Sequence, residues 1–223
     1  MEHTDFALAF RDGATITDDN GAPATMRVYA LGELVAPSGA IVACDPLTAI
    51  APRPFARRVA PGRYPVLVSV AQLADGDQRV ACAQLRLSDA PVARWEMARL
   101  AGQERIALRE GEFLGYAVYA TVGCFMDAQA SSVLDARYER DEGYDEELID
   151  ALEAHHTEAW GYADVALDDD SGLNVIIFSS GWGDGDYASY WGYDADGAPA
   201  CLVTDFGLFI AGGLMLDRAR YGE

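Results

Sequence analysis

Apolar and polar residues alternate along much of the first half of the chain, and this pattern predicts β-strands. Short β-type runs occupy residues 6–10, 25–31, 64–71 and 78–87. Turn-forming segments rich in Asp, Asn and Gly separate neighbouring runs, as expected where strands reverse direction. The first half is therefore expected to consist mainly of strands.

Two further runs, residues 33–36 and 40–43, flank Pro37-Ser38-Gly39 and predict a hairpin with a tight turn. Asp45-Pro46 should end the second strand, because proline cannot donate to a sheet ladder. Residues 51–62 are rich in Pro and Arg and predict an extended connector.

The middle of the chain mixes patterns. Residues 92–100, which include Trp95, suggest a short helix, whereas residues 115–126 return to strand character and then turn. Residues 131–138 and 145–160 have helical spacing. In the second helix, the acids of the first turn lie where the helix dipole favours negative charge.

Strand patterns dominate the last third. Residues 173–179 form a nearly continuous apolar run, typical of a central strand. Residues 187–193 and 200–206 flank Asp194-Ala195-Asp196-Gly197, a strong hairpin signal. Together these segments predict a β-rich α+β fold: an antiparallel, sandwich-like core with two or three helices inserted in mid-chain. We expect one domain over residues 1–223.

Composition fits an ordinary globular protein, with 51% hydrophobic and 23% charged residues. No apolar run reaches the roughly 18–20 residues that a membrane span needs, and the N-terminus lacks the features of a signal peptide. The four cysteines are widely separated and form no C-x-x-C pair. These features predict reduced, structural thiols and a cytoplasmic location.

The charge is unevenly distributed. Residues 1–110 hold 12 arginines and 13 acids (net −1), whereas residues 111–223 hold 4 arginines and 23 acids (net −19). Such a field repels nucleic acids and anionic membranes and attracts cations and basic proteins. It favours a basic protein partner over nucleic acid or membrane, although a merely solubilising surface would have the same composition.

The segment Ser179-Ser180-Gly181-Trp182-Gly183-Asp184-Gly185-Asp186-Tyr187 has the most unusual composition. Its glycines permit close backbone approach, and Asp184 and Asp186 could join Asp127 and Asp205 around Ca²⁺ or Mg²⁺. A structural turn would use the same residues. Both alternatives stay open.

Aromatic residues near this segment form a second candidate site. Trp182, Tyr187, Tyr190 and Trp191 could line a ligand pocket, although aromatics at alternating strand positions are commonly part of the core. Cys124, which lies among turn residues, is the cysteine best placed for reactivity. The chain has no G-x-S-x-G, no P-loop, no H-E-x-x-H and no lysine.

Several of these segments together resemble the domain-of-unknown-function family 4241, over residues 30 to 210. The resemblance rests on these residues: Leu31-Gly32-Glu33-Leu34, Ser38-Gly39, Asp45-Pro46-Leu47, Gly62-Arg63-Tyr64-Pro65-Val66, Gly115-Tyr116, Gly123-Cys124-Phe125-Met126-Asp127, Ser180 through Tyr187, Tyr190-Trp191-Gly192 and Thr204-Asp205-Phe206.

The resemblance implies a single domain of bacterial type with a shared site around the glycine-rich segments. This chain departs from the family pattern at Tyr119, where an aspartate is expected, and at Val122, where a small or polar residue is usual. If the family aspartates bind a cation together, this member lacks one ligand.

Three functions remain. The favoured hypothesis is a non-enzymatic protein whose acidic second half binds a basic protein partner. The second is a hydrolase or lyase assisted by a divalent cation at Asp127, Asp184, Asp186 and Asp205. The third is a domain that binds a small molecule in an aromatic pocket.

Overall fold

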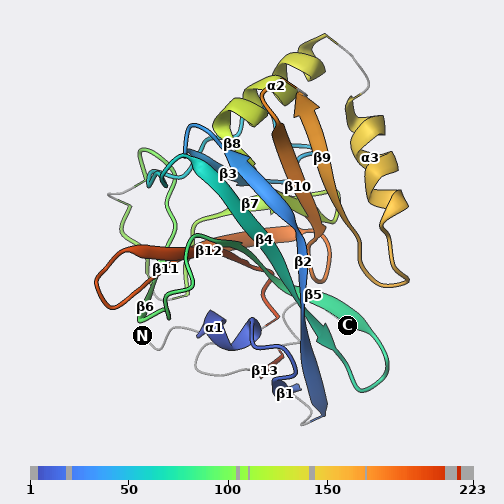
Figure 1. Cartoon of the computed structure of the whole chain (residues 1–223). Helices are drawn as coiled ribbons and strands as arrows, with labels where there is room; N and C mark the ends of the chain where they lie inside the picture. The colour runs from blue at the N-terminus through green and yellow to red at the C-terminus, as the bar shows by residue number, and fades with distance from the viewer. Residues whose placement is uncertain are drawn as a thin grey trace.

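The computed structural model describes residues 5–18, 22–103, 106–109, 111–140, 144–168, 170–208 and 215–216. Within them the protein is a β-rich α+β structure, with two curled, almost entirely antiparallel sheets and three helices (Figure 1). None of the described helices is long and apolar enough to cross a membrane.

The larger sheet has nine strands in the order β13-β1-β2-β4-β5-β12-β11-β6, and β7 also pairs with β11. In chain order its strands are β1 (Thr15–Asp18), β2 (Pro23–Ala36), β4 (Gly62–Gln72), β5 (Gln78–Arg86), β6 (Arg94–Met97), β7 (Gly115–Val118), β11 (Gly185–Tyr193), β12 (Pro199–Asp205) and β13 (Met215–Leu216).

The smaller sheet has four strands, in the order β3-β8-β10-β9. They are β3 (Ile41–Cys44), β8 (Val122–Asp127), β10 (Leu173–Ser179) and β9 (Tyr162–Asp168). Helices α2 (Ala128–Glu139) and α3 (Tyr144–Ala154) lie along the side of this sheet, while the short α1 (Phe6–Ala9) lies near the larger sheet (Figure 1).

Strand β10 separates two apolar layers. Ile176 and Phe178 belong to the core shared with the larger sheet, whereas Val175 and Ile177 pack in the cluster that includes α2 and α3. Both faces of this strand are covered, which explains why its sequence is a continuous apolar run rather than an alternating one.

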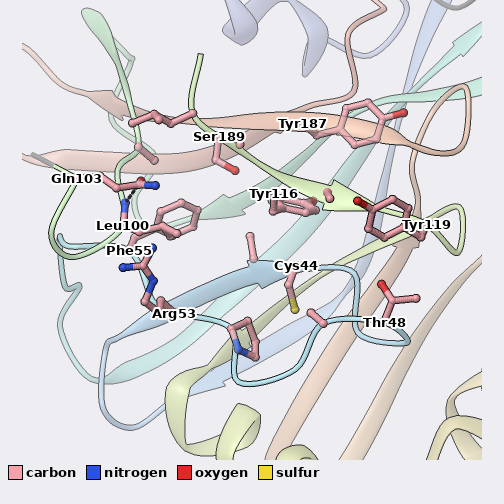
Figure 2. A pocket seen from close by; sticks show the side chains of 17 residues that line it. Cys44, Thr48, Arg53, Phe55, Leu100, Gln103, Tyr116, Tyr119, Tyr187 and Ser189 are labelled. Carbon is pink, nitrogen blue, oxygen red and sulfur yellow. Dashed lines mark hydrogen bonds between the residues drawn. The ribbon is translucent and has the colours of Figure 1, made fainter. Parts of the chain in front are cut away.

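The layer between the sheets is not filled everywhere. Near the start of β7, residues of both sheets and of the loops that follow β3 and β6 leave a cavity of about 290 Å³ (Figure 2). Phe55, Tyr116 and Tyr187 are among the residues that line it. The fold therefore builds a hollow at one end of its core.

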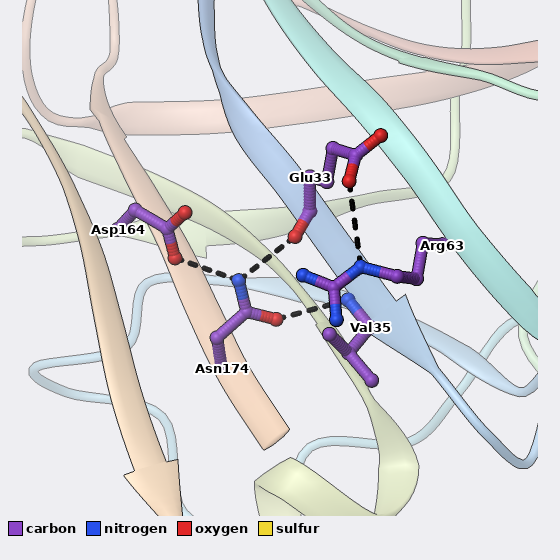
Figure 3. Close-up of polar contacts among 5 residues, drawn as sticks. All are labelled: Glu33, Val35, Arg63, Asp164 and Asn174. Atoms are coloured by element: carbon purple, nitrogen blue, oxygen red, sulfur yellow. Dashed lines mark hydrogen bonds and ion pairs between the residues drawn. The ribbon is translucent and has the colours of Figure 1, made fainter. Parts of the chain in front are cut away.

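Asn174 of β10 joins the smaller sheet to the open edge of β2. Its Oδ1 accepts from the Val35 N–H (2.9 Å), and its Nδ2 donates to the Glu33 carbonyl (3.0 Å) and to Asp164 Oδ1 (2.6 Å) (Figure 3). Pro65, which has no N–H, lies opposite Glu33 on β4. The Asn174 amide thus supplies the hydrogen bonds that a further strand would give to β2.

Residues 6–10, expected to be a strand, form α1 instead. The Asp5 side chain caps this helix by accepting from the Ala7 N–H (3.2 Å). Phe6 and Ala9, three positions apart, are both buried, and the Phe6 ring lies 4.9 Å from the Tyr190 ring. Two buried positions at this spacing share one face of a helical turn, whereas in a strand they would point to opposite faces.

The helix expected over residues 92–100 is also wrong, because Arg94–Met97 forms the edge strand β6 beside β11. Arg94 and Glu96 are exposed, whereas Trp95 and Met97 are partly buried. This alternation with a period of two is the strand signal that the sequence contains.

The hairpin expected around Pro37-Ser38-Gly39 does not form. The chain leaves the larger sheet after Ala36 and enters the smaller one, where β3 pairs with β8. Gly39 has φ of 67°, and a Cβ there would collide with the Val59 carbonyl oxygen. Ser38 donates through its N–H and hydroxyl to Asp127 (3.0 and 2.8 Å). These contacts fix a crossover between sheets.

Most other expected elements are confirmed. They include the strands over 64–71, 78–87 and 173–179, the β11–β12 hairpin, and the helices that begin within or beside 131–138 and 145–160. The second helix is shorter than expected and ends at Ala154.

Replacing Asn174 by Ala should lower the free energy of unfolding by about 2–4 kcal/mol, because two backbone groups of β2 lose their partners. Chemical denaturation measures this loss. Gln129→Ala, at an exposed position of α2, should change stability by less than about 0.5 kcal/mol. Equal stability of Asn174→Ala and wild type would show that the sheets are held together without this amide.

Candidate functional site

The glycine-rich segment after β10 forms a tight turn into β11. Gly181 and Gly183 have φ of 61° and 106°. The Tyr187 hydroxyl donates toward the carbonyls of Gly183 (2.7 Å) and Ser180 (3.1 Å) and closes the turn. Asp184 Oδ1 accepts from the Thr121 N–H (3.2 Å). This segment therefore ties the β10–β11 turn to the β7–β8 turn.

The structure does not bring the four candidate metal ligands together. Asp127 is fully buried at the start of α2, where it accepts from Ser38 and the Gln129 N–H. Asp184 contacts Thr121, at the opposite end of β8. Asp186 and Asp205 line a separate hollow of about 70 Å³. Among the described residues, no group of three or more His, Cys, Asp or Glu side chains is arranged to hold a metal ion.

Cys124 lies opposite Cys44 on the neighbouring strand, with the two sulfur atoms 3.7 Å apart. Both are free, buried cysteines. The contact with Cys124, followed by burial, raises the pKa of the Cys44 thiol well above its usual value. Cys44 therefore stays a protonated thiol near neutral pH.

The four aromatic candidates are dispersed. Tyr187 lines the 290 Å³ cavity, and Tyr190 lines the smaller hollow. Trp191 is buried against Phe55, with ring centroids 6.1 Å apart. The Arg79 guanidinium lies 4.8 Å from the Trp182 ring, and Trp182 Nε1 is buried without a hydrogen-bond partner in the described chain.

Four separate parts of the described chain build the 290 Å³ cavity. They are the end of β3 with its following loop, the turn after β6, the start of β7 with Tyr119, and the middle of β11. The lining residues are Ala43, Cys44, Thr48, Ala49, Pro52, Arg53, Phe55, Ala98, Leu100, Gln103, Leu114, Gly115, Tyr116, Ala117, Tyr119, Tyr187 and Ser189.

Polar groups lie at both ends of this mainly apolar space. Arg53 and Gln103 lie at the end beside Phe55 and Leu100, whereas Thr48 and Tyr119 lie at the other end (Figure 2). Gln103 Oε1 accepts from the Leu100 N–H (3.0 Å). The arrangement combines apolar walls with a few placed polar groups, as is typical of small-molecule sites.

Tyr116 forms the wall between these two ends. Its hydroxyl is buried and has no hydrogen-bond partner among the described residues. Burial raises the pKa of this phenol well above its usual value, while the nearby Thr204 hydroxyl lowers it by a smaller amount. The hydroxyl packs over Gly123, where a Cβ would come within 2.6 Å of it. Tyr116 is therefore a neutral side chain whose hydroxyl lies close to the Thr204 hydroxyl.

Both loops at the mouth of the cavity contain a strained residue. Ala51 (φ 47°) and Thr121 (φ 58°) are the two non-glycine residues with positive φ in the described chain. Ala51 lies between lining residues Ala49 and Pro52, and Thr121 lies two residues after Tyr119. Such backbone costs about 1–3 kcal/mol per residue and is concentrated at functional sites in proteins.

Buried Asp45 fixes the two mouth loops relative to each other. Its Oδ2 accepts from the N–H groups of Tyr119 (2.9 Å) and Ala120 (2.8 Å), and its Oδ1 accepts from the Leu47 N–H (3.0 Å). The side chain is fully shielded from solvent. Both carboxylate oxygens are thus used by backbone groups, and Tyr119 is positioned through them.

Sequence reasoning missed this cavity, because its residues come from distant segments and form no motif. One signal was available: Phe55 is a single aromatic residue within the Pro- and Arg-rich connector. A large apolar side chain in an irregular segment implies that the segment packs onto the core.

Fold and site together define a two-sheet α+β protein with a cavity at one end of its core. Residues 34–204 match the family described as "Protein of unknown function (DUF4241)". The chain belongs to this family. Neither a curated protein nor a solved structure matches the chain.

Asp45→Asn should destabilise the protein by about 2–4 kcal/mol, because an amide nitrogen would face backbone N–H groups in a buried site. Thermal or denaturant unfolding measures the effect. Asp194→Asn is the matched control: its Oδ1 accepts from the N–H groups of Asp196 and Ala198 in a surface hairpin turn, where asparagine is well tolerated. Equal effects of the two substitutions would contradict the role given to Asp45.

Proposed function

We propose that the protein binds a small organic molecule in the cavity between its sheets. The observation that supports this most directly is the coincidence of the cavity with the two strained loops at its mouth. Ala51 and Thr121 hold unfavourable backbone angles where the chain surrounds the opening. A fold that needed only a packed core would gain stability by filling this space and relaxing these turns.

The lining favours binding over catalysis. Its described residues include no carboxylate and no imidazole. The only thiol among them is Cys44, whose pKa is raised by the contact with Cys124 and by burial. The usual general bases and activated nucleophiles are therefore missing from the described walls, and the apolar surface is suited to enclosing a ligand.

Filling the cavity tests the proposal. Ala98 is a buried lining residue at the end of β6, so Ala98→Phe should occupy the space into which a ligand would fit. A set of neutral, anionic and cationic aromatic and aliphatic fragments is screened against wild type by saturation-transfer NMR. We expect several hits with Kd near 0.1–1 mM, as fragments of this size allow, and their loss in Ala98→Phe.

Two further variants make this experiment decisive. Ala117→Phe fills the cavity from β7 and covers the case in which Ala98→Phe unfolds. Ala166→Phe, at an exposed position of strand β9, should bind like wild type. The proposal is wrong if no fragment is displaced by either cavity-filling substitution while the variants remain folded by circular dichroism.

A second candidate is the docking of a basic protein on α3. The exposed acids of this helix are Asp145, Glu146, Glu147, Asp150 and Glu153. Of the six ion pairs between described residues, only Arg137–Glu147 (2.8 Å) lies within residues 111–223. Most of this acidity is therefore available to attract a cationic partner at long range.

Neutralising four of these acids (Asp145→Asn, Glu146→Gln, Asp150→Asn and Glu153→Gln) should weaken binding of a short polyarginine peptide roughly tenfold at low salt, since each exposed pair contributes a few tenths of a kcal/mol. Fluorescence anisotropy measures this. The control variant neutralises Asp89, Glu96, Glu112 and Asp196, which are exposed on other elements. If both variants lose the same affinity, the charge acts diffusely and α3 is no docking site.

A further inference from the structure

We infer that the ligand of this cavity is an amphipathic anion: a flat apolar body held between the walls, with a carboxylate or similar group on Arg53. The inference rests on the proposed function and names the ligand's chemistry. It follows from the charges around the cavity, the fixing of Arg53 and the polarity of the two ends.

The charge at one end of the cavity favours an anionic ligand. The chain carries a net charge of −20, yet Arg53 is the only charged side chain among the described residues that line the cavity. Two acids that contact the mouth loops, Asp45 and Asp184, accept hydrogen bonds from backbone N–H groups of residues 47 and 119–121. Arg53 makes this end of the cavity positive within an otherwise acidic protein. This end therefore repels cationic ligands and attracts anionic ones.

Arg53 has few protein partners of its own in the described part of the chain. Its Nη1 donates to the Ala101 carbonyl (3.3 Å), and it forms no ion pair with any described carboxylate. The carbonyl contact orients the guanidinium of this exposed side chain, and most of its five donors have no partner among the described residues. A guanidinium binds a carboxylate through two parallel hydrogen bonds, so a ligand anion would complete it.

The backbone next to Arg53 is held in place. The loop that carries Arg53 is anchored two residues earlier, where the strained Ala51 donates its N–H to Asp135 Oδ1 of α2 (3.0 Å). This contact limits how far Arg53 can withdraw from the opening. The strained, anchored loop thus presents the Arg53 guanidinium at the mouth of the cavity.

The apolar body of the ligand has a matching surface. Phe55 and Leu100 lie beside Arg53, and the Tyr116 ring continues this surface toward Tyr119 (Figure 2). A planar ring system can pack against these groups while its anion stays at the Arg53 end. At the other end, Thr48 and Tyr119 offer hydroxyl groups for a second polar substituent.

Matched probes test the charge preference. 2-Naphthoate, 2-naphthamide and 2-naphthylmethylammonium share one ring system and differ in charge. Isothermal titration calorimetry on the full chain should give an affinity for the naphthoate about 5–30-fold higher than for the amide, as expected for a partly exposed guanidinium–carboxylate pair. The ammonium compound should bind most weakly of the three.

Substitution then assigns the preference. Arg53→Gln should make naphthoate and naphthamide bind equally, while the amide's affinity stays within about twofold of wild type, because only the charge-assisted bond is lost. The control is Arg58→Gln, since Arg58 is an exposed arginine that does not line the cavity. That variant should keep the full preference for naphthoate.

The outcomes separate the two proposals. If naphthoate and naphthamide bind wild type equally in a manner that Ala98→Phe abolishes, the cavity binds ligands but the anionic class is wrong. A preference that survives Arg53→Gln also overturns the inference. If the cavity-filling variants change the binding of none of the fragments or probes, the proposed function itself fails.

Discussion

The structure depends on a side-chain amide that replaces a missing strand. Strand β2 pairs with β4 along its length, but beyond its short pairing with β1 its other edge has no strand partner among the described residues. Asn174 fills this gap by accepting from Val35 and donating to Glu33. Unpaired edge groups at an interface between sheets would cost about 1–3 kcal/mol each. The contact therefore determines where the smaller sheet stands against the larger one.

The position of the smaller sheet against the larger one determines where the cavity forms. With the sheets joined at Asn174, β3 lies beside β7, and the space near their ends is enclosed by these strands, by β11 and by the loops that follow β3 and β6. Loops can enclose a hollow only if something holds them in place. Asp45 does this through three backbone N–H groups, and Asp184 adds a bond to Thr121. Buried Asp45 and exposed Asp184 thus serve as structural anchors in this chain, although Asp184 was a candidate metal ligand.

The sequence predicted correctly those elements that depend on residues close together in the chain. The β11–β12 hairpin followed from Asp194 through Gly197, and the central strand β10 followed from its apolar run. Errors arose where a distant partner decides the outcome: Ser38 turns toward Asp127 of another sheet, and Trp95 packs on Phe6. The cavity could not be predicted for the same reason, because Arg53, Tyr116 and Ser189 become neighbours only through the crossover between sheets. The family resemblance was confirmed. The glycine-rich segment from Ser179 to Tyr187 forms a turn near the cavity.

The bond from Ala51 to Asp135 has a consequence for communication across the molecule. Asp135 belongs to α2, which packs with α3, so the helical layer and the opening of the cavity share one mechanical link. Anything that shifts α2 must strain or release the loop that carries Arg53. By thermodynamic linkage the effect is reciprocal, and a molecule that immobilises the loop also steadies the helices. Helices α2 and α3 and the 290 Å³ cavity are therefore coupled through the hydrogen bond between Ala51 and Asp135.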